Sequence, residues 1–215
     1  MDSSIAWIFS IFAGNTLCYP LDNIKSRAQC NFNTHIKLSH LFYGYKYFII
    51  NILIARFLTF TSYVTLTEHI HPFPTVFLIS LVSSMISTPL EMLKINKQIE
   101  TNNKYKFSEL HKLYKGYNYA FYRDFTSTGF YFPLYFYLKN NYDNPTYING
   151  FIAGCMSKIV SYPFDTIKTI KQSGLFVKHN KFFYLFNGIT YETLRTGTSS
   201  LIIFSTYEHI MSKLK

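Results

Sequence analysis

Six long stretches rich in apolar and aromatic residues alternate with shorter polar stretches along the chain. Three of them end just before a Pro that charged residues follow: residues 5–19, 74–88 and 147–162. Because a bilayer core of about 30 Å requires about 20 helical residues, each of these stretches can span a membrane only together with the segment beyond its Pro. We therefore expect three helices that continue through a proline and bend there, at Pro20, Pro89 and Pro163.

The other three apolar stretches each begin after a Gly that follows an aromatic residue by one or two positions: residues 45–70, 117–138 and 189–211. Pro72, Pro74 and Pro145 predict short connections between hairpins, while Gly150 and Gly154 have a spacing that allows close helix packing in lipid. The pattern predicts an all-α membrane protein with six transmembrane helices in three hairpins.

One eleven-residue segment occurs three times, at residues 19–29, 88–98 and 162–172. In each copy an acid stands two residues after the Pro, a Lys five after and a Gln nine after. The prolines lie 69 and 74 residues apart, which indicates repeats of about seventy residues. Because such a unit is too short to bury a core of its own, we expect one integrated domain built from three repeats, residues 1–71, 72–143 and 144–215.

Composition agrees with a membrane protein that has a polar interior, since 20% of residues are aromatic and 15% are charged. The net charge of +10 is spread over the repeats, so we expect no nucleic-acid partner. Three cysteines without a Cys-x-x-Cys pair predict neither a zinc site nor a disulfide framework. No catalytic or phosphate-binding motif is present, and we expect neither an enzyme nor a bound metal or cofactor.

Three Pro-x-[Asp/Glu]-x-x-[Lys/Arg] boxes, each followed by an aromatic residue, a Gly and a second apolar stretch, resemble the mitochondrial carrier family over essentially the whole chain. The resemblance implies a monomeric, multi-pass solute transporter of the mitochondrial inner membrane with threefold pseudosymmetry. A water-filled central cavity would open alternately to the matrix and to the cytosolic side. A membrane lipid such as cardiolipin would be a further partner.

The three boxes predict a gate on the matrix side. Since an acid and a Lys three residues apart lie on one helix face, threefold symmetry lets each acid meet the Lys of the next repeat. The expected ion pairs are Asp22 with Lys94, Glu91 with Lys168, and Asp165 with Lys25. In the family, glutamines one turn further on brace these pairs, and the corresponding residues are Gln29, Gln98 and Gln172. One box alone could be a solvated helix end, but three with the same order of charges argue against that interpretation.

The opposite side departs from the family's pattern. Aligning the repeats without gaps from their glycines puts the acid position of the family's second box at Val64, Phe136 and Glu208. Moving the first repeat by four residues would bring in Glu68 and His71, but it would leave a much shorter connection before the next repeat. In the ungapped alignment the cytosolic gate is weak and consists of Tyr63, Tyr135, Lys139, Tyr207 and Glu208.

Charged residues inside a membrane span are costly and mark transport pathways. Family members contact their solute thirteen residues before the acid position of the second box, which here holds Asn51, Arg123 and Arg195. We add Asp124, which follows Arg123, and Lys158, five residues before Pro163. An Arg beside a carboxylate can bind a carboxylate and balance an ammonium or sulfonium, and so favours a zwitterion. Alternatively, this pair only neutralises its neighbours.

Within the family, residues 116–139 look most like S-adenosylmethionine carriers. The expected solute is therefore an amino-acid-like zwitterion such as S-adenosylmethionine, moved by antiport. Two alternatives stay open. A nucleotide or cofactor carrier would suit Lys158 and Arg195, although Asp124 would repel phosphates. A degenerate, non-transporting membrane scaffold would suit the weak cytosolic gate.

Overall fold

The computed structural model describes residues 3–32, 37, 40–54, 72–100, 110–142, 145–174 and 182–214. Every regular element in these ranges is helical, so the all-α class is confirmed. In chain order the elements are α1 (Ser3–Gln29), an apolar helical segment at Tyr45–Ile54, α3 (Pro72–Gln98), α4 (Leu110–Leu113), α5 (Tyr117–Asn141), α6 (Thr146–Ser173), η3 (Phe182–Phe186) and α7 (Ile189–Leu214).

Helices α1, α3 and α6 each continue through the predicted proline, at Pro20, Pro89 and Pro163. The prediction of a connection at Pro72 and Pro74 is wrong, because α3 begins at Pro72. A helix tolerates Pro in its first turn, where the backbone N–H has no intrahelical partner.

Left-handed glycines stand at the start of the second helix of each repeat. Gly44, Gly116 and Gly188 have φ of +83°, +85° and +85°, a region that other residues rarely adopt. A Cβ on Gly44 would lie 2.9 Å from the carbonyl oxygen of Lys94, so the backbone of the second repeat leaves no room for a side chain there.

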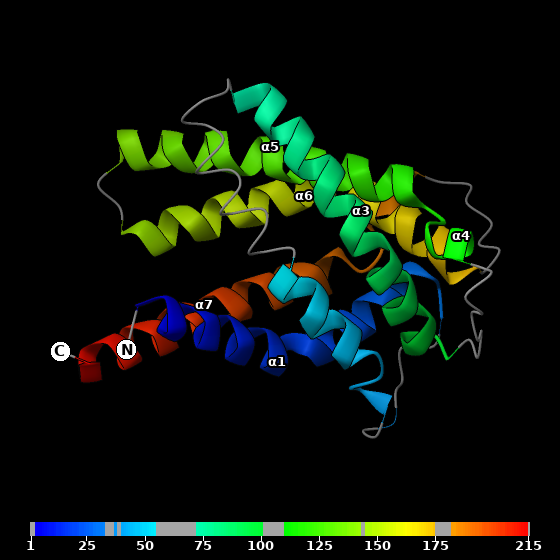
Figure 1. Ribbon diagram of the computed structural model, residues 1–215, viewed down its shortest axis with the longest axis horizontal. Coiled ribbons are helices and arrows are strands. Elements are labelled where there is room, and N and C mark those ends of the chain that lie inside the picture. Colours follow the sequence, from blue (N-terminus) through cyan, green and yellow to red (C-terminus); the bar gives the residue numbers. More distant parts are fainter. Residues whose placement is uncertain are drawn as a thin grey trace.

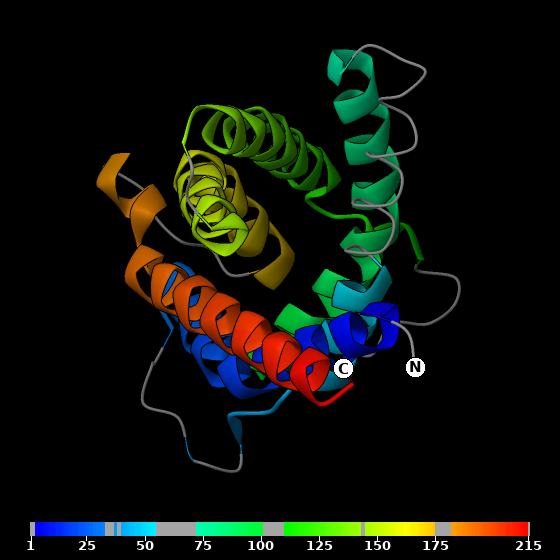
Figure 2. The same ribbon diagram turned by 90° about the vertical axis from the view of Figure 1, so that its left-hand side faces the viewer.

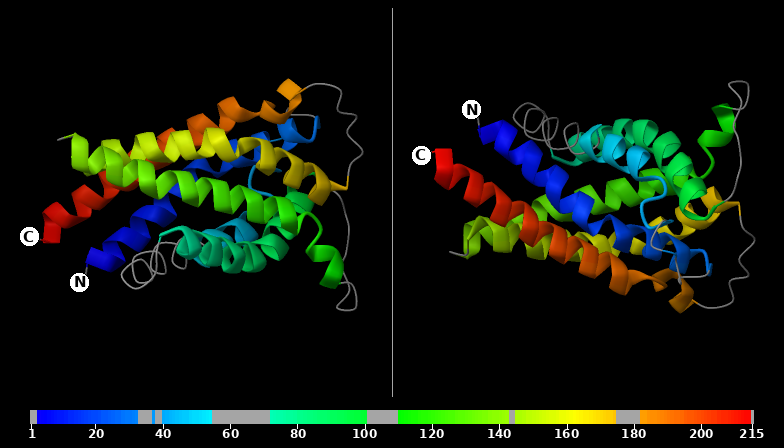
Figure 3. Two further views of the ribbon diagram at one scale, coloured as in Figure 1. Left: turned by 90° about the horizontal axis from the view of Figure 1, so that it is seen from above. Right: turned by 90° about the horizontal axis from the view of Figure 1, so that it is seen from below.

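The long helices run side by side, and both chain termini lie at one end of the bundle (Figures 1 and 3). Viewed along the bundle, α5 lies beside α6 and α7 lies beside α1, which are the most extensive contacts between described elements (Figure 2). Helix α3 packs against α5. The halves of α1, α3 and α6 that follow their prolines meet at the end far from the termini (Figure 3).

Helices α1 and α7 approach each other closely at Gly14. A Cβ there would be 2.6 Å from the Ile203 side chain and 2.9 Å from the Ser199 carbonyl oxygen, so α1 and α7 touch backbone to backbone. The expected close packing at Gly150 and Gly154 is wrong, since a Cβ on Gly154 would meet nothing within 4 Å. The spacing of two glycines allows close approach, but the neighbouring helix here lies against another face.

Polar side chains face the inside of the bundle, and large apolar side chains face outward. On α3 the buried residues include Ser80, Ser83, Ser84, Ser87 and Thr88, whereas the exposed ones include Phe77, Leu78, Leu81, Val82, Met85 and Ile86. Helix α6 repeats the pattern, with Ser157 and Ser161 buried and Met156, Ile159 and Val160 exposed. This is the reverse of the usual distribution in water-soluble proteins.

By length and composition, one described helix is apolar enough to cross a membrane, at Pro74–Gln98. The other long described helices do not meet this criterion, and α6, for example, contains Lys158, Asp165, Lys168 and Lys171.

Candidate functional site

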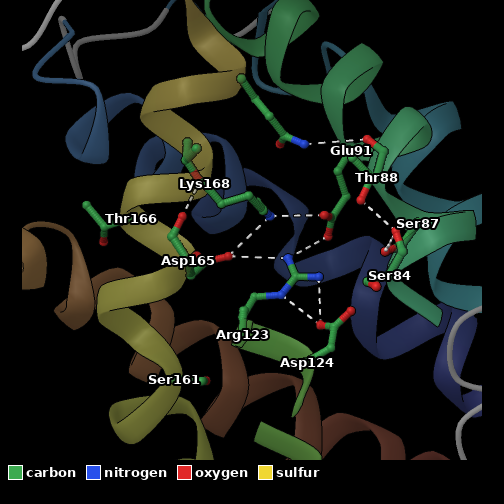
Figure 4. Close-up of polar contacts among 12 residues, drawn as sticks. Ser84, Ser87, Thr88, Glu91, Arg123, Asp124, Ser161, Asp165, Thr166 and Lys168 are labelled. Carbon is green, nitrogen blue, oxygen red and sulfur yellow. Dashed lines mark hydrogen bonds and ion pairs between the residues drawn. The ribbon is translucent and has the colours of Figure 1, made fainter. Parts of the chain in front are cut away.

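A ring of acids and lysines joins the three proline helices. Each of its three ion pairs links two repeats, and they are Asp22 Oδ2–Lys94 Nζ at 2.9 Å, Glu91 Oε2–Lys168 Nζ at 3.0 Å and Asp165 Oδ2–Lys25 Nζ at 2.6 Å. These are the pairs that the sequence predicts. All six side chains are at most 13% exposed. Figure 4 shows the part of the ring between α3 and α6.

Two of the three predicted glutamine braces are present. Gln29 Nε2 donates to Asp165 Oδ2 and Gln98 Nε2 donates to Asp22 Oδ2, each at 3.0 Å. Gln172 is different, because its Nε2 lies 3.5 Å from the carbonyl oxygen of Thr88, and no bond to the Glu91–Lys168 pair is seen among the described residues. Both oxygens of Glu91 already accept bonds from cations, which removes the need for the third brace.

Arg123 is the cation that binds Glu91 where the third glutamine brace was expected. From α5 its Nη1 lies 2.8 Å from Glu91 Oε1 and 3.4 Å from Asp165 Oδ1, so it joins α3, α5 and α6 (Figure 4). Its Nε and Nη2 both lie 2.8 Å from Asp124 Oδ1. The residue expected to bind solute therefore touches two acids of the ring directly.

Arg195, on α7, approaches the third acid of the ring, Asp22, as Arg123 approaches the other two. Its guanidinium donates two hydrogen bonds to Glu192, at 3.0 and 2.8 Å, and its Nε lies 3.8 Å from Asp22 Oδ1. Glu192 Oε2 also lies 3.3 Å from Lys25 Nζ. The sequence predictions missed Glu192, although its position three residues before Arg195 places both on one helix face.

Several buried polar atoms lack a hydrogen-bond partner among the described residues. Two of them belong to predicted solute residues, Asn51 Oδ1 and Asp124 Oδ2, and a third is Thr196 Oγ1, beside Arg195. A buried polar atom without a partner is costly and calls for a ligand or a water molecule. Lys158, on α6, is near enough to interact electrostatically with Glu192. Of the predicted solute residues, Arg123 and Arg195 thus contact acids of the ring directly.

Buried tyrosines tie two proline helices to the glycine turn of their own repeat. The Tyr19 hydroxyl donates to the carbonyl oxygen of Tyr43, and the Tyr162 hydroxyl donates to that of Asn187 at 2.9 Å. Both tyrosines stand directly before the Pro, and this repeated aromatic residue was the signal that could have revealed them.

A second ionic contact joins the first two repeats beyond the helices. Arg27 Nη2 lies 2.7 Å and His40 Nδ1 lies 2.9 Å from Glu100 Oε1. Hydrogen bonds from Arg27 and His40 lower the pKa of Glu100 below its usual range. Glu100 has a φ of +58°, which is uncommon for a residue with a side chain.

The predicted cytosolic gate is only partly within the described residues. Tyr63 and the side chain of Glu208 lie outside them. Tyr135 stacks on Tyr131 of its own helix, with ring centroids 6.0 Å apart. Within the described part of the chain, Lys139 is exposed and forms no ion pair, so no charged network is seen on this side.

Comparison of the sequence with models of protein families and with curated proteins gives no match in either case. The function of the chain is therefore inferred from its own residues and their geometry.

Proposed function

We propose that this protein is a membrane-embedded solute transporter of the mitochondrial carrier type, with six spanning helices and alternating access. The observation that carries this proposal is the closed ring of three buried ion pairs between repeats, inside a bundle whose outer surface is apolar. The inner mitochondrial membrane is the location that the resemblance implies.

The apolar outer surface supports a membrane location. Contiguous apolar patches above a few hundred Å² are rare on water-soluble monomers and mark contact with a protein or a membrane. Here large apolar side chains are exposed along α1, α3 and α6 alike, and these helices come from all three repeats. Contact with lipid tails costs such a surface no free energy, whereas its exposure to water is unfavourable. Most charged residues of these helices are buried or half-buried, as a transport pathway requires, and the exposed ones, Lys97 and Lys171, lie in the last turns of α3 and α6.

Buried ion pairs add little to the stability of a fold, but they suit a gate that alternates between two conformations. Replacing such a pair with packed apolar residues often leaves stability unchanged, whereas removing one partner costs about 3–5 kcal/mol. The ring therefore holds the matrix side closed while its six charges remain matched. Moving the repeats apart requires other partners for these charges, and the surrounding arginines and carboxylates are placed to supply them.

The solute that suits this site is an amino-acid-like zwitterion such as S-adenosylmethionine, exchanged by antiport. A solute carboxylate would compete with Glu91 and Asp165 for Arg123, so binding would loosen the ring. Asp124 Oδ2 and Asn51 Oδ1 are buried acceptors that have no partner among the described residues, and they would receive an ammonium group. A sulfonium would be balanced by the same carboxylate.

A membrane scaffold with the same architecture is the second candidate. It is favoured by the cytosolic side, where Lys139 is exposed and Tyr135 stacks within its own helix. A scaffold needs no opening of the ion-pair ring, so a direct test of that opening distinguishes the two functions.

A disulfide across the ring provides this test. Cys30 follows α1, Ser173 ends α6, and their side chains form a hydrogen bond. The Ser173→Cys variant therefore places a second thiol beside the native Cys30. Oxidation should join α1 to α6 and stop uptake of S-adenosylmethionine into proteoliposomes, and a reductant should restore it.

Burial raises the pKa of the Cys30 thiol to about 11. Because the thiolate is the reactive form, oxidation is best done with a copper catalyst at a pH of about 9. The Cys30→Ser/Ser173→Cys variant is the matched control, and oxidant should leave its uptake unchanged. Unchanged uptake by fully cross-linked protein would exclude a ring that opens during transport.

A further inference from the structure

We infer that Glu192 is a positioning residue of the transport cycle, which keeps Lys25 paired when the ion pair between Lys25 and Asp165 breaks. This inference rests on the proposed transport function. The role follows from the position of the Glu192 carboxylate, which contacts Lys25 of α1 and Arg195 of α7.

Lys25 lies between two carboxylates from different helices. Its Nζ is 2.6 Å from Asp165 Oδ2 on α6 and 3.3 Å from Glu192 Oε2 on α7. The side chains of Lys25 and Glu192 are only 10% and 3% exposed, so water can stabilise their charges only weakly. If α6 moves away with Asp165, a carboxylate already in contact remains with Lys25.

Helix α7 can keep this contact because it packs along α1, whereas α6 touches α1 over a much smaller region. Gly14 of α1 approaches the backbone of α7 at Ser199. One turn further along α1, Cys18 Sγ lies 3.1 Å from Thr198 Oγ1. These contacts between α1 and α7 lie outside the ring, so opening the ring does not itself break them.

Glu192 is held in place for this role by Arg195. Two hydrogen bonds at 3.0 and 2.8 Å fix both oxygens of its carboxylate. The same guanidinium lies 3.8 Å from Asp22, the acid in the same box as Lys25. Helix α7 therefore offers a second partner to both charged residues of the first box.

Position 192 is specific to the third repeat. The equivalent residues, four after the glycine of each repeat, are Phe48 in the first and Ala120 in the second. Neither of these residues carries a charge: Phe48 contacts Lys94 only through its ring, and in the second repeat it is Arg123, three residues after Ala120, that contacts Glu91. Lys168 also has a second carboxylate, Asp165 Oδ1 at 3.3 Å, but that acid is already the ring partner of Lys25. At the interface between the first and third repeats the second carboxylate, Glu192, belongs to none of the three boxes.

Transport kinetics of Glu192→Gln, Glu192→Asp and Asp165→Asn in proteoliposomes test this role, with rates normalised to folded protein. Glu192→Gln should lower the maximal rate by about tenfold or more and leave the half-saturation concentration within about twofold. Glu192→Asp, which keeps the charge, should recover much of the rate. A structural role alone would reduce the amount of folded protein and leave the rate per folded molecule unchanged, and that result would overturn the inference.

Thermal unfolding gives a second test that needs no transport. In each single variant Lys25 keeps one carboxylate, so the Asp165→Asn/Glu192→Gln double variant should lower the unfolding midpoint by more than the two single shifts together. Additive shifts would overturn the inference. An altered rate in Asp165→Asn with a normal rate in Glu192→Gln would also overturn it while leaving the proposed function intact. A wild-type protein that transports no zwitterion would instead remove the proposed function itself.

Discussion

Replacing Arg123 with Gln removes the ion-pair partner of Asp124 and one of the two cations on Glu91. Glu91 keeps Lys168 at 3.0 Å, and Asp165 keeps Lys25 at 2.6 Å, so the ring itself can remain closed. Asp124 is destabilised more, because its side chain is only 18% exposed and loses both contacts to Arg123 at 2.8 Å.

The cost of this change follows from the charge left behind. Breaking a buried ion pair by removing one partner costs about 3–5 kcal/mol. At 2–4 °C per kcal/mol for a chain of this size, the unfolding midpoint of Arg123→Gln should fall by about 6–20 °C. The Arg123→Gln/Asp124→Asn double variant buries no unpaired carboxylate there. It should lose about 2 kcal/mol, mainly from the missing bond to Glu91.

The assay is thermal unfolding in detergent, followed by uptake of S-adenosylmethionine into proteoliposomes. The double variant should be more stable than Arg123→Gln, yet neither should transport, since both lack the guanidinium that would receive the solute carboxylate. For stability, Asp124→Asn alone is the matched control, because it retains Arg123 and its contacts to Glu91 and Asp165. A double variant less stable than Arg123→Gln would refute the electrostatic reasoning, and normal uptake without Arg123 would refute its role toward solute.

The remaining predictions concern the braces and the contact outside the spans. Gln98→Ala should cost about 1.5–3 kcal/mol, since it removes a bond to the charged Asp22, whereas Gln172→Ala should cost about 1 kcal/mol or less. Equal shifts of the unfolding midpoint would contradict this difference. Because the pKa of Glu100 is lowered, its contribution is present above the pKa of the unfolded chain and is lost as pH falls through the folded value. Glu100→Gln should therefore show a smaller loss of stability than wild type between about pH 5 and 3, and parallel pH profiles would contradict the contact.

The ring could be predicted because it depends on symmetry. An acid and a Lys at fixed spacing after a Pro, repeated three times, leave two cyclic ways to match charges between repeats, and the ion pairs of Asp22, Glu91 and Asp165 follow the one that joins each acid to the Lys of the next repeat. The left-handed glycines could be expected as helix starts for a similar reason, since the same residue type recurs at the same place.

The features that differ between the three repeats could not be predicted. Glu192 has no counterpart in the other repeats, so no repeated pattern marks it as part of the site. Gln172 repeats the pattern of Gln29, yet Arg123 already satisfies the acid that it would have braced. Whether a glycine is closely packed depends on where the next helix lies, and a spacing cannot determine that.

The central claim, that the ion-pair ring is a gate that opens in every transport cycle, is tested most directly by the disulfide between Cys30 and Ser173→Cys. Uptake of S-adenosylmethionine should fall to background when the disulfide is complete and return to the starting rate after reduction. Cross-linked protein that transports as fast as its reduced form would contradict the claim.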